Sequence, residues 1–165
     1  MSDWCGLTGP FSALVVGARG GIGSKFVEHL SRSPAVHQVH AIGRDETWAN
    51  TASDYQKVVR HRADLTVESN LVSISDIIKK SDVPLRFAIN CSGLLHDDDL
   101  QPERTWRHLN LETMRRVFDV NTFGVALYIK HFLPLMPRRG RSIMASLSAR
   151  VGSIADNSIG GWYSY

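Results

Sequence analysis

Residues 14–23 read Leu14-Val15-Val16-Gly17-Ala18-Arg19-Gly20-Gly21-Ile22-Gly23, in which a short apolar strand runs directly into closely spaced glycines. Apolar side chains then recur at helical spacing, with Ile22, Phe26, Val27 and Leu30 on one face. Glycine has no Cβ, so the backbone can turn sharply and bring its N–H groups against a ligand. The start of a helix favours negative charge, and the stretch therefore predicts a site for a dinucleotide diphosphate.

The spacing of the glycines narrows this prediction. The usual Rossmann fingerprint has glycines at the first, third and sixth places of the turn. Here Gly17, Gly21 and Gly23 form Gly-x-x-x-Gly-x-Gly, and Gly20 is additional. We expect Gly17, Gly21, Ile22 and Gly23 to contact the cofactor.

The composition limits the classes of protein to which the chain can belong. Its 165 residues are 43% hydrophobic and 21% charged, which is typical of one soluble globular domain. The net charge of +3 is small and the basic residues are scattered, so we expect no nucleic-acid partner. No apolar run approaches the roughly 20 residues that cross a bilayer, and Met1–Pro10 lacks a signal core, so we expect a cytoplasmic protein without membrane contact.

The residues that commonly bind metals are sparse. Cys5 and Cys91 are too few for a zinc motif, and Cys91 lies in an apolar run typical of a buried thiol. The acidic loop His96-Asp97-Asp98-Asp99 has no second ligand group at metal-binding spacing. We therefore interpret this loop as solvated surface and predict no metal site.

Strand-like and helix-like segments alternate along the chain. Strands are expected at 13–16, 38–42, 57–61, 85–90 and 141–147, and helices at 22–31, 67–80 and 111–136. Residues 46–56 have no regular pattern, and we expect them to be irregular. This alternation predicts an α/β fold, a Rossmann-like doubly wound parallel sheet with helices on both faces.

The residues at the ends of the strands form a more specific pattern. They comprise the glycine turn, Asp64, Asn90-Cys91-Ser92-Gly93, Asn121 and the serines after residue 145. With this set the chain resembles the short-chain dehydrogenase/reductases, and residues 152–157 and 160–165 are most similar to the subgroup of C-factor and sniffer-type carbonyl reductases. The resemblance implies the strand order 3-2-1-4-5-6-7, truncated here after the fifth strand.

The resemblance also implies roles for these residues. Asp64 and Leu65 would border the adenine, and the segment with Asn90, Ser92 and Gly93 would line the cofactor ribose and stabilise the central sheet. Asn121 would kink the long helix and position a water molecule. Cys91-Ser92 departs from the Asn-Ala pair common in the family, which affects the side-chain contacts expected there more than the backbone contacts.

The cofactor preference depends on the residue after the second strand. A carboxylate at that place accepts from a ribose hydroxyl, whereas a guanidinium pairs with a 2′-phosphate. Gly43-Arg44 therefore favours NADP(H), with NAD(H) possible because Asp45 is adjacent. Arg19 in the glycine turn would add a second positive charge.

By the same resemblance the chain is an oxidoreductase acting on a small carbonyl or secondary alcohol. Tyr165 is the candidate proton donor, with Tyr163 as its rival, and Ser148 is the candidate that holds the substrate oxygen, with Ser146 in competition. In the family, a lysine four residues after the tyrosine supplies the positive charge that acidifies it, and we expect this chain to be a fragment that lacks the catalytic lysine, because its 165 residues end at Tyr165.

Family members continue beyond the segment that this chain covers. We expect residues 1–165 to be a single NAD(P)-binding Rossmann domain, incomplete at its C-terminus, inactive alone, and a homodimer or homotetramer when full length. The alternative is a non-catalytic NAD(P)-binding signalling protein that resembles C-factor.

Overall fold

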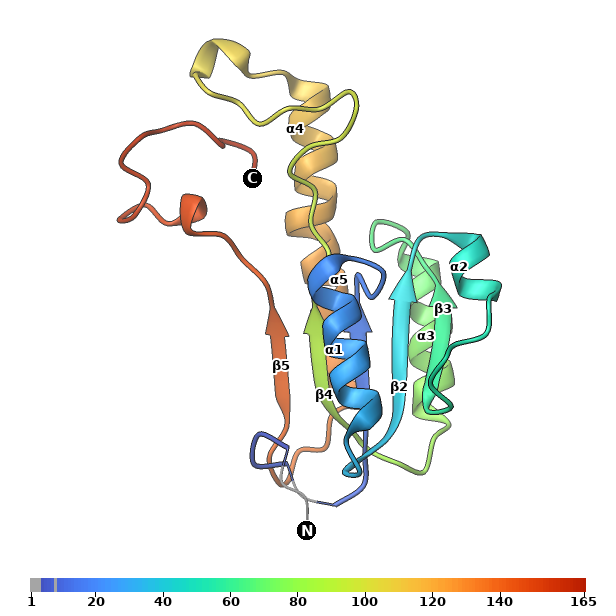
Figure 1. Ribbon diagram of the computed structural model, residues 1–165. Helices are drawn as coiled ribbons and strands as arrows, with labels where there is room; N and C mark the ends of the chain where they lie inside the picture. Colours follow the sequence, from blue (N-terminus) through green and yellow to red (C-terminus); the bar gives the residue numbers. More distant parts are fainter. Residues whose placement is uncertain (1–3, 8) are drawn as a thin grey trace.

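Five parallel strands form one sheet in the order β3-β2-β1-β4-β5 (Figure 1). The computed structural model describes residues 4–7 and 9–165. The strands are β1 (Phe11–Val16), β2 (Val36–Gly43), β3 (Val58–Arg62), β4 (Leu85–Asn90) and β5 (Ile143–Ser146). The expected Rossmann-like α/β fold is thereby confirmed, with the strand order 3-2-1-4-5 over the part of the family sheet that the chain covers.

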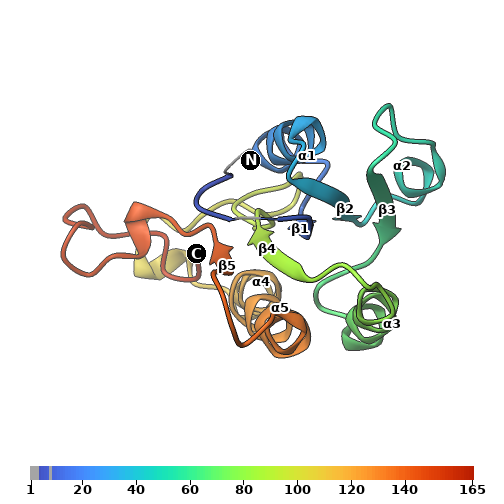
Figure 2. The same cartoon turned by 90° about the horizontal axis from the view of Figure 1, so that it is seen from below.

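Helices cover both faces of this sheet. Figure 2 shows α1 (Gly21–Arg32) on one face, and α3 (Glu68–Lys79), α4 (Leu111–Phe118) and α5 (Gly124–Phe132) on the other. Short 3₁₀ segments lie at Trp106–His108, Leu133–Leu135 and Arg150–Gly152. Within the described part of the chain, no helix combines the length and the apolar character needed to cross a membrane.

The core has two layers because successive side chains of a strand point to opposite faces. On β1, Phe11, Ala13 and Val15 pack toward α1, whereas Leu14 and Val16 pack toward α3 and α5. Every residue of β1 is buried. Burial on both faces is why this strand has a continuous apolar sequence instead of an alternating one.

The expectation of irregular structure at 46–56 is wrong for its first half. A short helix, α2 (Glu46–Asn50), follows β2 directly. Asp45 caps it, since its Oδ1 accepts from the Trp48 N–H at 2.7 Å. A hydrogen bond of this kind satisfies an amide that the first helical turn leaves without a partner. The Trp48 ring packs on the core, and the Arg60 guanidinium lies 5.0 Å from its centroid.

The single helix expected over 111–136 is interrupted. A π-helical segment, η2 (Asp119–Phe123), separates α4 from α5. Such a segment inserts an extra residue into a helix and is frequent at functional sites. Beyond it, Tyr128 and Phe132 are fully buried against the sheet, and the Tyr128 hydroxyl donates to the Ala145 carbonyl of β5 at 3.2 Å.

Two histidines lie side by side on neighbouring strands. His40 of β2 and His61 of β3 are buried, and His40 Nδ1 is 3.0 Å from His61 Nε2. Burial, and secondarily the charge of His61, lowers the pKa of His40 from 6.5 to about 4. Burial also lowers the pKa of His61. The fold therefore favours the neutral form of both rings.

This pair predicts acid sensitivity of the fold. The unfolded chain binds a proton at His40 near pH 6.5, whereas the folded chain resists it to about pH 4. The contribution of buried His40 to the free energy of unfolding is therefore fully present above pH 6.5 and is lost as the pH falls toward 4. Urea denaturation at pH 7 and pH 5 should show that the lower pH reduces the free energy of unfolding less in His40→Leu than in the original chain. His37→Leu changes an exposed histidine on the same strand and should keep the pH dependence of the original chain. If His40→Leu also kept that pH dependence, His40 would not be the source of the acid sensitivity.

Candidate functional site

Two adjoining cavities lie where the carboxyl ends of the five strands meet. The first has a volume of about 410 Å³ and the second about 320 Å³. Both are lined by Cys91, Ser92 and Gly93, which directly follow β4. Ligands of open α/β sheets bind at this edge, and the joined cavities are thus the candidate site.

The glycine turn forms one wall of the first cavity. Gly17 has φ +72°, and a Cβ there would lie 2.7 Å from the Ser92 nitrogen and 2.8 Å from the Cys91 carbonyl carbon. The Gly20 N–H donates to the Gly17 carbonyl at 3.0 Å, which closes the turn. Only glycine permits this conformation and this close approach.

The turn delivers the start of α1 to the junction of the two cavities. Gly20 lines the first cavity and Ile22 lines the second. The N-cap residue Gly20 supplies no side-chain oxygen to the first amides of the helix. Those amides and the positive end of the helix dipole fit a diphosphate, so the cradle suits the dinucleotide that the sequence predicts.

Charged side chains also line the first cavity. Arg19 Nη1 lies 2.7 Å from Asp45 Oδ2, in an ion pair whose arginine is largely exposed. Arg44 is exposed and lines the cavity, and it makes no hydrogen bond or ion pair with any residue that the structure describes. Asp64 also lines the cavity, but its Oδ1 accepts from the Thr66 N–H and hydroxyl. An anion near Arg44 would thus meet a guanidinium without another partner.

Asn90 directly precedes the residues that line both cavities, but it lines neither cavity itself. Its side chain is fully buried, and its Nδ2 donates to the Ser146 hydroxyl of β5 at 3.2 Å. Its Oδ1 accepts from the Ser92 N–H at 3.0 Å and from the Ser92 hydroxyl at 2.5 Å. Asn90 therefore holds Ser92 at the cavities and joins β4 to β5, and its contact with the cofactor ribose stays a prediction.

Asn121 holds the next residues of the same loop. It lies in the π-helical segment and lines the second cavity. Its Oδ1 accepts from the Leu94 N–H at 2.8 Å, and its Nδ2 donates to the Leu94 carbonyl at 2.9 Å. These two bonds use both ends of the amide and fix the loop over the cavity.

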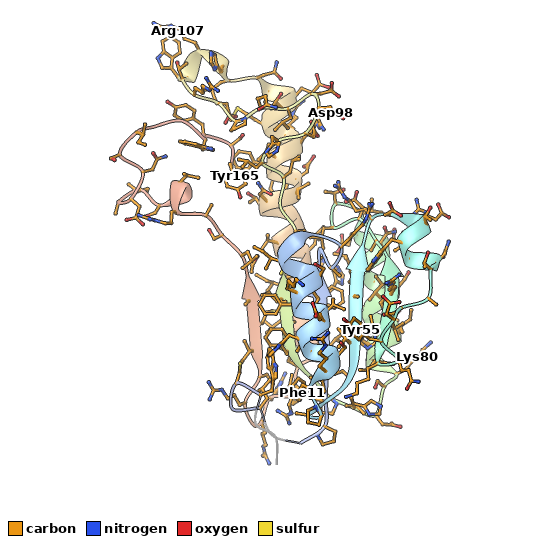
Figure 3. All side chains as sticks on the ribbon, viewed as in Figure 1. Phe11, Tyr55, Lys80, Asp98, Arg107 and Tyr165 are labelled. Carbon is orange, nitrogen blue, oxygen red and sulfur yellow. The ribbon has the colours of Figure 1, made fainter. Side chains whose placement is uncertain are left out.

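The second cavity contains the candidate catalytic side chains. Ser148 and Tyr165 both line it, together with the apolar residues Leu95, Val125 and Leu147. Figure 3 shows Tyr165 beside α4, at the end of the molecule that also carries Asp98 and Arg107. The two alternative candidates, Ser146 and Tyr163, do not line the second cavity. The Ser146 hydroxyl bonds to Asn90 instead, and Tyr163 lies elsewhere in the terminal loop.

Cys91 is less enclosed than the buried thiol that its apolar run predicts. The residue is half-buried, packs against the core on the α1 side of the sheet and lines both cavities. Burial raises its pKa, which favours the protonated thiol. Its place directly after β4 was the available signal, since residues just beyond strand ends face the ligand edge. Among residues 4–7 and 9–165, no group of three or more His, Cys, Asp or Glu side chains is arranged to hold a metal ion.

Comparison with known proteins identifies relatives. The family model for short chain dehydrogenases matches residues 12–160. A curated relative, the 1-hydroxy-2-glutathionyl-2-methyl-3-butene dehydrogenase of Rhodococcus sp. (strain AD45), is 26% identical over 102 residues. That match covers 62% of this chain and 42% of the relative, so the matched region spans less than half the length of that protein.

Solved structures share the fold. The Sniffer carbonyl reductase of Caenorhabditis elegans matches with a TM-score of 0.77 and 28% identity, covering 93% of this chain and 69% of that one. An NADPH-bound carbonyl reductase from chicken fatty liver matches with a TM-score of 0.76 and 25% identity, covering 96% and 68%. This chain is therefore similar over nearly its whole length to about two thirds of each.

The glycine cradle predicts a selective effect on stability. Gly17→Ala should lower the free energy of unfolding by about 2 kcal/mol or more, because the new Cβ meets the backbone of Cys91 and Ser92 at a positive φ. Gly21→Ala is the matched control, since no atom lies within 4 Å of a Cβ there, and it should stay within about 1 kcal/mol of the original chain. Equal stabilities of the two variants in urea denaturation would contradict the packing described here.

Proposed function

This chain belongs to the short-chain dehydrogenase family, and from that premise we propose that it is an NADP(H)-dependent oxidoreductase interconverting a carbonyl and a secondary alcohol. The observation that carries the proposal is the shared cavity of Ser148 and Tyr165, which adjoins the glycine cradle at Cys91–Gly93. A proton donor, an oxygen-binding hydroxyl and a dinucleotide cradle are the parts that this reaction needs.

The residues of the second cavity have distinct roles in the proposed reaction. When bound, the nicotinamide group supplies or accepts the hydride. The Ser148 hydroxyl donates a hydrogen bond to the substrate oxygen and holds it in place. The Tyr165 hydroxyl gives its proton to the same oxygen during reduction and takes it back during oxidation. Leu95, Val125 and Leu147 line the cavity with apolar surface, which keeps water from the reacting carbon.

The preference for NADP(H) rests on Arg44. Its guanidinium lines the first cavity beyond β2 and has no ion-pair or hydrogen-bond partner in the described structure, so it is available to a 2′-phosphate. Arg19 lines the same cavity and pairs with Asp45, and a phosphate bound at Arg44 would compete with Asp45 for it. The chicken carbonyl reductase, with bound NADPH, is consistent with this preference.

The exposed face of α4 and of the segment after it supports a further part of the proposal. Leu111, Phe118 and Phe123 are each at least one third exposed on it. Large apolar side chains that are exposed along one helical segment are a feature of interfaces between protein chains. We infer that the full-length protein is a homodimer or homotetramer that uses this face.

Replacement of the proposed proton donor tests the function directly. In the full-length protein, Tyr165→Phe should lower the rate of NADPH oxidation with a panel of small aldehydes and ketones by about a hundredfold or more, because the ring remains and only the proton-donating hydroxyl is lost. Tyr163→Phe, a change two residues away and outside the cavity, should keep the original rate. Full activity of Tyr165→Phe would refute the proposed role. Tight NADPH binding without turnover of any carbonyl would support the non-catalytic nucleotide-binding alternative.

The positive charge of Arg44, just after β2, predicts which of the two cofactors binds more tightly. Arg44→Gln should weaken NADPH binding about tenfold and leave NADH binding nearly unchanged, because only NADPH carries the phosphate that the guanidinium meets. Fluorescence titration of the bound nicotinamide measures both affinities.

Asp45→Asn is the opposite charge change at the adjacent residue. An asparagine keeps the cap of α2 but releases Arg19, so NADPH binding should tighten relative to NADH. Equal effects of Arg44→Gln on the two cofactors would argue against the preference.

A further inference from the structure

A buried carboxylate lies in the loop between β4 and α4. Glu103 is only 4% exposed, although its neighbour Arg104 is exposed. Burial of an ionised carboxyl group is costly unless hydrogen bonds or opposite charges compensate for it. Such a residue therefore requires a structural reason, and its partners identify that reason.

All the described partners of Glu103 come from the terminal loop. The Ser164 hydroxyl donates to Glu103 Oε1 at 2.6 Å, and the Ser164 N–H points to Oε2 at 3.5 Å. The backbone carbonyl of Glu103 accepts from the Trp162 N–H at 2.8 Å. One residue thus holds the loop at two places, across a sequence separation of 61 residues for the Ser164 bond.

The local backbone is shaped to allow this contact. Gly161 has φ +82°, and a Cβ there would lie 2.8 Å from the Glu103 carbonyl oxygen. Trp162 adopts φ +49°, an unusual value for a bulky residue. The chain therefore accepts a strained conformation at the point where it meets Glu103, as positions near functional sites often do.

Tyr165 follows this contact immediately. Its N–H donates to the Trp162 carbonyl at 3.3 Å, while its side chain makes no hydrogen bond to any residue that the structure describes. The ring lines the second cavity, yet 36% of the residue is exposed. Its place is consequently set by the backbone of residues 162–164 and not by bonds of its own hydroxyl. Figure 1 shows the terminal loop returning toward α4 to reach this position.

We propose that Glu103 is a positioning residue that acts through Ser164 to hold Tyr165 at the second cavity. The proposal rests on the proposed function, in which Tyr165 transfers the proton. A carboxylate suits this role because it accepts from both the hydroxyl and the N–H of one residue. In Glu103→Gln an amide nitrogen replaces one of the two carboxylate oxygens. This nitrogen is a donor, so it cannot accept the hydrogen bond from Ser164.

Two small changes in the full-length protein test the contact between Glu103 and Ser164. Glu103→Gln and Ser164→Ala should each lower kcat for carbonyl reduction roughly tenfold and leave KM for NADPH within about twofold, because the proton donor is displaced while the cofactor cradle is intact. The double variant should be no slower than the slower single variant, since both changes break one contact. Asp98→Asn, an exposed carboxylate on the same loop, is the control and should keep the original kcat.

A second measurement separates this proposal from the proposed function. With 3-fluorotyrosine at the four tyrosines, the Tyr165 fluorine signal can be assigned from its loss in Tyr165→Phe. Without any ligand, this signal should move toward that of an exposed tyrosine in Glu103→Gln and in Ser164→Ala, but not in Asp98→Asn. Absence of turnover in the full-length protein would refute the proposed function, whereas the fluorine signal would still decide whether Glu103 holds Tyr165. An unmoved signal in both variants, or additive losses of kcat, would overturn the proposal, and if one variant does not fold the other decides.

Discussion

The close approach of the Gly17 backbone to Cys91 and Ser92 is the contact on which the site depends. A positive φ at Gly17 turns the chain sharply after β1, and the absence of a Cβ lets it lie against the end of β4. The turn then starts α1 at the point where the two cavities meet. Any larger residue would separate the helix from the loop, and the cradle and the second cavity would no longer adjoin.

Polar side chains extend this arrangement across the sheet. Asn90 joins β4 to β5 and to Ser92, and Asn121 binds both backbone groups of Leu94. Glu103 does the same for the terminal loop through Ser164. In each case a buried or half-buried polar group satisfies the backbone or side chain of a loop, as groups without water must. The loops at this edge are thus held in place by the residues beneath them.

The sequence predicted the elements whose cause is local. Alternating strand and helix patterns located the five strands and the main helices, and the glycine spacing located the cradle. It failed at α2, where the cap made by Asp45 outweighs the weak periodicity of the segment. The apolar pattern over 111–136 predicted one continuous helix, because it is the same with or without one extra residue in a turn, whereas the π-helical interruption includes Asn121, where the family resemblance implied a kink.

Residue types and their spacing were sufficient to determine the fold class, the family resemblance and the candidates Gly17 and Arg44, because those features depend on backbone freedom and on positions just after strands. The candidates Asn121 and Tyr165 followed from the family resemblance. Only the folded chain distinguished Ser148 from Ser146. The register of β4 and β5 sets Ser146 opposite Asn90 and leaves Ser148 at the cavity. The bonds of Glu103 to Ser164 were likewise invisible in the sequence, since a contact between residues 61 positions apart exists only after the intervening helices and strand have packed.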